Sequence, residues 1–132
     1  MKSIYIAVTA HDPLNRVETT LEVLKGYESI ELQKEIDIFI DYDHRLDVDE
    51  FSLIVASHTK LNRVGFVVAG EEYTDYKLCW AHKHSLIKKI SNKAHNFYMY
   101  SENDMLFPSH DQTRQNPGSR FCVFSSSLYL CQ

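Results

Sequence analysis

Four short apolar runs recur along the chain, and segments in which apolar residues repeat at helical spacing separate them. The runs are residues 3–9, 35–41, 63–70 and 96–100, which read SIYIAVT, EIDIFID, RVGFVVAG and NFYMY. Their β-branched and aromatic residues favour strands, and the first run carries almost no charge, as expected for burial on both faces of a sheet. Strands that alternate with helices predict right-handed crossovers and a largely parallel sheet. We therefore expect a Rossmann-like α/β domain with three layers, α/β/α.

Three helices are expected between these runs. Asp12 and Pro13 predict the start of the first helix, as N-cap and first helical residue, and Gly26 predicts its end. Either Asp47 or Asp49 is expected to cap the second helix. The third helix is expected to be long and amphipathic, with Trp80 in the core. Its predicted stripe comprises Tyr76, Cys79, Trp80, Lys83, Ile87 and Ile90.

Length and composition favour one domain. The 132 residues are 44% hydrophobic and 24% charged, which is typical of a single globular unit. We expect residues 1–132 to form one domain, in which residues 109–132 are an irregular tail or extra strands. The run FCVFSSSLYLC, residues 121–131, predicts a further strand or a pair of strands.

Charge and cysteine content limit the partners and the compartment. The net charge of -4 leaves no basic surplus for a nucleic-acid backbone, so nucleic acid is not an expected partner. The apolar run at the amino terminus is closed by Asp12 and Pro13 and is too short to span a membrane. Cys79, Cys122 and Cys131 are odd in number and show no zinc-site spacing, which favours a reducing, cytoplasmic setting.

Acidic and polar residues follow the predicted strands. The carboxyl ends of parallel strands share one edge of a sheet, so these residues are expected to gather there. They are Thr9, His11, Asp12, Asp41, Asp43, Gly70, Glu71, Glu102 and Asp104. Carboxylates crowded on one rim repel one another unless water or a divalent cation separates them. This pattern predicts a Mn²⁺ or Mg²⁺ site with a diphosphate ligand, although Asp12 as an N-cap and Asp41 as a strand end remain the plainer interpretations.

The segment YMYSENDM, residues 98–105, resembles the acidic signature of GT-A nucleotide-sugar glycosyltransferases. In that signature a hydrophobic strand runs into a D-x-D or similar triplet followed by an apolar residue. IYIAVTAHDPLNRVETTLEVL, residues 4–24, is similar to the first strand, loop and helix of the family. IDIFIDYD, residues 36–43, looks like its second strand, and YKLCWAHKHSLIKKI, residues 76–90, resembles the helix before the signature. The resemblance covers residues 3–108.

This resemblance implies a metal-dependent transferase with a nucleotide-diphosphate sugar as donor and an unknown acceptor. Asp104 would ligate the Mn²⁺ or Mg²⁺ that holds the donor diphosphate, and Glu102 would contact ribose or the metal through water. Asn103 stands where the family often has another acid. The residues implied beside the nucleotide are Thr9, His11 and Arg16, with Asp41 and Asp43 at the base and ribose pocket. Asp111 is the sole carboxylate after Asp104, and no catalytic base is assigned.

Two other functions stay open. IFIDYDHRL, residues 38–46, also has the form of a strand followed by D-x-D, as in haloacid-dehalogenase-like phosphatases. There Asp41 would be the nucleophile and Asp43 the general acid. A complete strand-helix unit precedes this motif, and Arg45 stands where Thr or Val is expected. The remaining alternative is a non-catalytic module that binds a nucleotide or a protein partner.

Overall fold

A computed structural model of the chain describes residues 2–73, 75–102, 122–125 and 129–131. The elements in chain order are β1 (Ser3–Ala10), α1 (Val17–Tyr27), β2 (Gln33–Ile40), the 3-10 helix η1 (Tyr42–Asp47), α2 (Val48–His58), β3 (Val64–Val68), the 3-10 helix η2 (Asp75–Trp80), α3 (Lys83–Ser91), β4 (Phe97–Glu102), β5 (Cys122–Ser125) and β6 (Tyr129–Cys131). The first four strands overlap the four predicted apolar runs.

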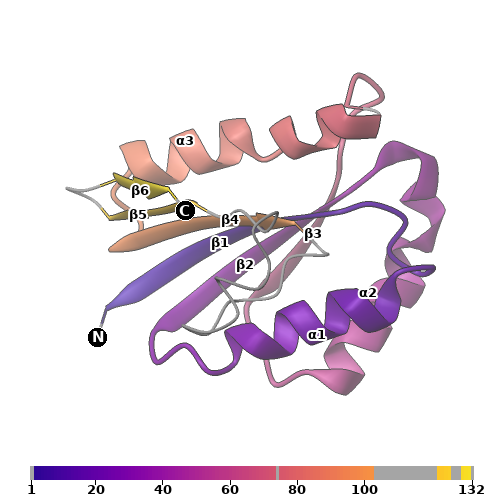
Figure 1. The fold of residues 1–132 in the computed structure, drawn as a ribbon, viewed down its shortest axis with the longest axis horizontal. Coiled ribbons are helices and arrows are strands. Elements are labelled where there is room, and N and C mark those ends of the chain that lie inside the picture. Colours follow the sequence, from indigo (N-terminus) through magenta and orange to yellow (C-terminus); the bar gives the residue numbers. More distant parts are fainter. Residues whose placement is uncertain (1, 74, 103–121, 126–128, 132) are drawn as a thin grey trace.

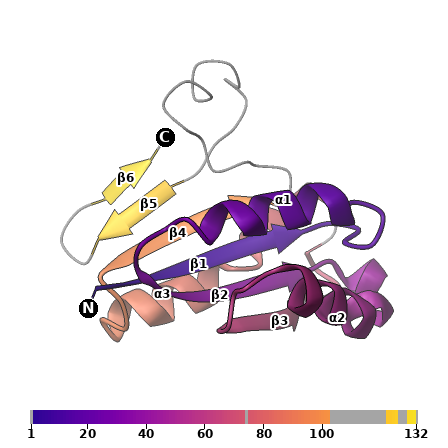
Figure 2. The same ribbon diagram turned by 90° about the horizontal axis from the view of Figure 1, so that it is seen from below.

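The strands form one sheet in the order β3-β2-β1-β4-β5-β6. The first four strands of that order are parallel, and β5 and β6 pair antiparallel beside β4. Helices α1 and α2 lie on one face of the sheet and α3 lies on the other (Figure 1). Figure 2, seen from the side of α1 and α2, shows β5 and β6 at the border next to β4. The expected α/β fold with a largely parallel sheet is therefore confirmed.

The face under α1 and α2 carries the larger apolar core. Successive side chains of a strand point to opposite faces, and the even-numbered residues of β1 and β2 point to this one. They meet the buried side chains of the two helices, and the rings of Phe51 and Phe66 pack edge to face with centroids 5.8 Å apart. The buried members are Ile4, Ile6, Val8, Ala10, Val23, Leu24, Tyr27, Ile36, Ile38, Ile40, Phe51, Val55 and Met99. Burying each large side chain contributes about 1.5–3 kcal/mol.

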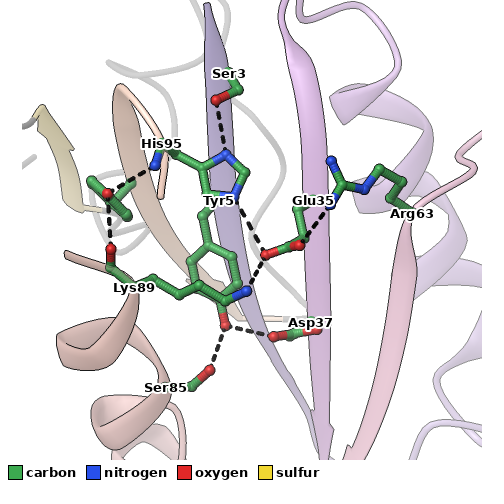
Figure 3. A network of polar contacts seen from close by, with 9 residues as sticks. Ser3, Tyr5, Glu35, Asp37, Arg63, Ser85, Lys89 and His95 are labelled. Carbon is green, nitrogen blue, oxygen red and sulfur yellow. Dashed lines mark hydrogen bonds and ion pairs between the residues drawn. The ribbon is translucent and has the colours of Figure 1, made fainter. Parts of the chain in front are cut away.

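Polar contacts help to attach α3 to its face of the sheet (Figure 3). The ring of Tyr5 is fully buried in a smaller apolar cluster with Leu86 of α3. Its hydroxyl donates to Asp37 Oδ2 at 2.8 Å and lies 2.9 Å from Ser85 Oγ. Because a phenol has one proton and Asp37 takes it, Ser85 is the donor in the second bond. Burial raises the pKa of Tyr5, so this phenol stays protonated.

Glu35 is the centre of the second half of this network (Figure 3). Its Oε1 lies 2.6 Å from Lys89 Nζ and 3.4 Å from His95 Nε2, and its Oε2 lies 3.1 Å from an Arg63 guanidinium nitrogen. His95 Nδ1 in turn lies 2.9 Å from Ser3 Oγ. These contacts tie α3 to β1, β2 and the segments that precede β3 and β4.

The first helix does not begin where the sequence predicts. Helix α1 starts at Val17, with Arg16 at the N-cap position, and ends at Tyr27, one residue after Gly26. Asp12 has a φ of +50°, in the left-handed region, so it cannot serve as an N-cap in extended conformation before a helical Pro13. The reason is tertiary, because Asp41, which directly follows β2, accepts a hydrogen bond from the backbone N–H of Asp12.

The predicted long third helix is also wrong, since it is divided into η2 and α3. The break after Trp80 changes the phase of the helical stripe, and Leu78 and Leu86 are buried. The Trp80 side chain is not in the core but 56% exposed, with Lys83 Nζ 5.6 Å from its ring centroid. Asp47 does occupy the N-cap position of α2, although its side chain makes no capping hydrogen bond.

Among the residues that the structure describes, no helix combines the length and the apolar character needed to cross a bilayer.

Candidate functional site at the carboxyl ends of the parallel strands

The strand order defines a switch point between β1 and β4. The chain moves from β1 to β2 and β3 on one side, then crosses back to place β4 on the other side of β1. In open α/β sheets, ligands bind in the crevice outside the carboxyl ends of the two strands at such a point. The register pairs Thr9 of β1 with Glu102 of β4. Two of the predicted site residues therefore lie side by side at this position.

Tyr100 connects these two residues. Thr9 is buried, and its Oγ1 lies 3.1 Å from the Tyr100 hydroxyl. The same hydroxyl donates to Glu102 Oε1 at 3.4 Å. Burial raises the pKa of Tyr100, and the nearby Glu102 carboxylate raises it further, so the phenol remains a donor at neutral pH. Tyr100 thus orients the half-buried Glu102 carboxylate.

His82 covers the other side of Tyr100. It lies between η2 and α3, and its ring stacks on the Tyr100 ring with centroids 4.0 Å apart and planes 16° apart. Burial lowers the pKa of His82 to about 4, so the imidazole is neutral at pH 7. The switch point is therefore bordered by a neutral aromatic pair, a threonine and a carboxylate.

A second polar cluster joins the ends of β1 and β2. Asp41 is buried, and its Oδ1 accepts a hydrogen bond from the Asp12 backbone N–H at 2.8 Å. Its Oδ2 lies 2.5 Å from His44 Nδ1, and His44 Nε2 lies 3.2 Å from Asp12 Oδ1. The three residues form a closed ring of contacts, which we call the histidine clamp. It fixes the loop after β1 against the start of η1.

The other predicted site residues lie around these two clusters. His11 is exposed, and its ring meets that of His44 edge to face with centroids 5.8 Å apart. Arg16 is exposed at the N-cap position of α1, and Asp43 is exposed in η1. Asp104, like Asn103, lies outside the described residues. The rim therefore brings together Thr9 with Glu102, and separately Asp41 with the loop that carries His11.

One carboxylate of the predicted metal site, Glu102, lies within the described residues. Within the described residues, no group of three or more His, Cys, Asp and Glu side chains could hold a metal ion. Mg²⁺ and Mn²⁺ prefer oxygen ligands, and Mg²⁺ is usually held by one or two carboxylates together with substrate phosphates. Glu102 fits this chemistry, because it presents a half-buried carboxylate at the switch point.

Three residues of the candidate site, His44, Tyr100 and His82, were not predicted from the sequence. His44 follows Asp41 at a spacing of three, which places both on one side of a helical turn, and this was the available signal. Tyr100 and Glu102 are two residues apart and therefore lie on the same face of β4. Residues at this spacing share a face in every strand, so the spacing does not single out Tyr100. No sequence pattern indicated that His82 stacks on Tyr100, because this contact depends on the break between η2 and α3.

A hollow of about 620 Å³ lies at the opposite edge of the sheet, where β2 and β3 begin. Its lining includes Glu28, Leu32, Lys34, Lys60, Leu61 and Arg63. Two of its cations are already engaged, because Lys34 Nζ donates to the carbonyls of Ile30 and Leu32 and Arg63 contacts Glu35. We therefore place the candidate site at the switch point and not in this hollow.

Comparison with solved structures shows the same fold in two synthases and a mannosyltransferase. The 4-diphosphocytidyl-2C-methyl-D-erythritol synthase from Anaerococcus prevotii aligns with a TM-score of 0.54 and 16% identity, over 89% of this chain and 50% of that chain. A mannosyltransferase from Pyrobaculum calidifontis, in complex with GDP-Man and Mn²⁺, aligns with a TM-score of 0.54 and 12% identity, over 82% of this chain and 29% of that one.

A second structure of 4-diphosphocytidyl-2C-methyl-D-erythritol synthase aligns with a TM-score of 0.53 and 11% identity, over 78% of this chain and 47% of that chain. This chain shares its fold with these three proteins. The chain spans half or less of the length of each of these three proteins. No protein-family model and no curated protein sequence matches the chain.

Proposed function

We propose that the chain binds a nucleotide-diphosphate sugar through a divalent metal ion and takes part in transferring the sugar to an acceptor. The observation that carries this proposal is the pairing of Thr9 with Glu102 at the switch point, the place where this type of sheet binds ligands. The mannosyltransferase of the same fold, whose structure contains GDP-Man and Mn²⁺, supports the class of ligand.

Each residue at the rim has a part in this proposal. Glu102 and Asp104 would hold Mn²⁺ or Mg²⁺, which would neutralise the diphosphate as it leaves the sugar. Tyr100 keeps the Glu102 carboxylate oriented, and fixed orientation of the reactants is itself a large part of such catalysis. The nucleotide would lie against Thr9, His11 and Arg16, with Asp41 and Asp43 at the edge of its base and ribose.

The phosphatase alternative is disfavoured by the environment of Asp41. A nucleophilic carboxylate needs a free oxygen directed at the substrate. Asp41 is buried, and both of its oxygens are engaged, one by the Asp12 backbone and the other by His44. Its contribution to the rim is therefore to hold the loop after β1.

Isothermal titration calorimetry with GDP-mannose, UDP-glucose and CDP-linked sugars, each with and without Mn²⁺, tests the proposal. We expect metal-dependent binding that is lost in Asp104→Ala and retained in Glu31→Ala. The control removes one exposed carboxylate from the loop before β2, at the other edge of the sheet. Normal binding by Asp104→Ala together with loss in Asp41→Ala would show that the acidic triplet is wrongly assigned.

An activity measurement separates the transferase from the binding module. Release of free sugar from the bound donor, or its transfer to an added acceptor, supports a transferase. Metal-dependent binding with neither reaction would assign the chain as a nucleotide-binding module.

A further inference from the structure

The histidine clamp of Asp12, Asp41 and His44 has a geometry that suits one protonation state of His44. Each ring nitrogen of His44 lies within 3.2 Å of a carboxylate oxygen, Nδ1 with Asp41 and Nε2 with Asp12. A neutral imidazole has a single N–H, whereas both nitrogens are donors in the imidazolium. The cationic ring satisfies both contacts, and the neutral ring would turn a lone pair toward one of the two carboxylates.

The surrounding charges act in the same direction. Asp12 from the loop after β1, Asp41 from the end of β2 and Asp47 from η1 all favour the cation. Arg45 is the nearest cation in the sequence, but its guanidinium donates to the Tyr42 carbonyl and lies over the Tyr42 ring. The His11 ring approaches edge to face, and the neighbouring Asp43 is exposed. The hydrogen bond to Asp41 raises the pKa of His44, and only part of that rise is offset by burial.

The two ends of the clamp differ in their exposure to water. The side chain of Asp41 is 5% exposed and that of Asp12 is 26% exposed. When His44 loses one proton, the remaining N–H stays on Nδ1 and donates to the buried Asp41, because an unpaired buried carboxylate costs more than a hydrated one. The Asp12 side chain then has no donor from His44 and is hydrated by water. The backbone of Asp12, at a φ of +50°, loses the side-chain contact that helps to hold it in this conformation.

We infer that His44 is a positioning residue for the nucleotide: it closes the loop after β1 over the rim while it bridges Asp12 and Asp41. This inference rests on the proposed function, which places the nucleotide beside that loop. Binding is therefore tighter when His44 is protonated and weaker when it is neutral. The pKa of His44 is raised above its ordinary value, near 6.5. The bridge from Asp12 through His44 to Asp41 is therefore complete below about pH 6.5 and is lost as the pH rises past the His44 pKa.

The test measures the affinity of the full chain for GDP-mannose and UDP-glucose with Mg²⁺ between about pH 6 and pH 8.5, a range that brackets an elevated histidine pKa. The diphosphate diester of a nucleotide sugar does not titrate there, so the ligand cannot mimic the effect. We expect about a fivefold fall in affinity across the range, comparable to the loss of one partly exposed charged contact. His44→Gln should bind weakly and independently of pH. His58→Gln, which alters an exposed histidine at the end of α2, should follow the wild type.

A second variant and a direct titration keep the inference testable if His44→Gln folds poorly. In Asp12→Asn one anionic partner is gone, so the pH midpoint of binding and the His44 pKa measured by NMR should both move downward. Equal pH profiles for the wild type and His44→Gln, or an unchanged His44 titration in Asp12→Asn, would overturn the role of His44 alone. Absence of nucleotide binding at every pH would overturn the proposed function and this role with it.

Discussion

Glu35→Gln is the sharpest test of how α3 is attached to the sheet. The substitution keeps the size and one acceptor oxygen of Glu35 but removes the charge that its three partners share. Burial pushes the pKa of Glu35 upward, but the hydrogen bond and charge of Lys89, together with His95, outweigh it, so the pKa lies below its usual value. A lowered carboxyl pKa means that the charged contacts stabilise the folded state above the unfolded pKa, near 4.3, and are lost as the pH falls.

The magnitude follows from the exposure of each partner. The Arg63 side chain is 59% exposed, so water screens its contact and it adds little. The Lys89 contact, at 2.6 Å from a carboxylate that is 18% exposed, is the larger one. A charged hydrogen bond of this kind contributes about 1.5 kcal/mol to the free energy of unfolding, and its loss should lower the melting temperature by about 5 °C.

The assay is urea unfolding of the wild type and Glu35→Gln from about pH 7 down to about pH 3, which spans the titration of a carboxyl group. The difference in free energy of unfolding should be full at neutral pH and shrink in acid, where Glu35 itself becomes neutral. Glu22→Gln, on the exposed side of α1, is the matched control and should track the wild type. A difference of constant size at every pH would mean that shape, and not charge, is what Glu35 contributes.

Two further substitutions examine the two faces of the sheet. Tyr5→Phe removes the hydroxyl between Asp37 and Ser85 and should cost about 1–2 kcal/mol in urea unfolding; an unchanged midpoint would show that water replaces the hydroxyl. Phe51→Ala leaves a cavity beside Phe66 in the other core and should cost about 3–5 kcal/mol; a loss below about 1 kcal/mol would mean that the site is not closely packed.

The strands could be predicted because their signal is local. The β-branched run at residues 3–9 became β1, and buried side chains occupy both of its faces, as its lack of charge indicates. The parallel direction of β1, β2, β3 and β4 also followed from the alternation of strands and helices. These features depend on a hydrophobic period that each segment carries by itself.

The predicted start of the first helix was wrong because a distant contact determines the backbone conformation there. Asp12 before Pro13 has the residue types of a helix start, but Asp41 and His44 hold Asp12 in a left-handed turn and α1 begins at Val17. The predicted apolar stripe through Trp80 was wrong because two residues between η2 and α3 interrupt the helical phase. The conformation of Asp12 is thus not encoded within the segment that it changes.

The candidate site was predictable as a place and not as a set of contacts. Strand ends in a parallel sheet meet at one edge, so Thr9 and Glu102 could be expected on the same rim, and the register makes them direct neighbours. The partners that orient them come from side-chain geometry. Tyr100 hydrogen bonds to both residues, and His44 joins Asp41 to the loop after β1.

The helices on the two faces of the sheet are attached by different forces. Aliphatic and aromatic packing holds α1 and α2, and added salt does not weaken that kind of contact. Part of the attachment of α3 consists of ion pairs and hydroxyl hydrogen bonds, and ionic strength and acid weaken the ion pairs. Such a domain has a helix that can open locally, next to Tyr100, while the rest of the molecule stays folded.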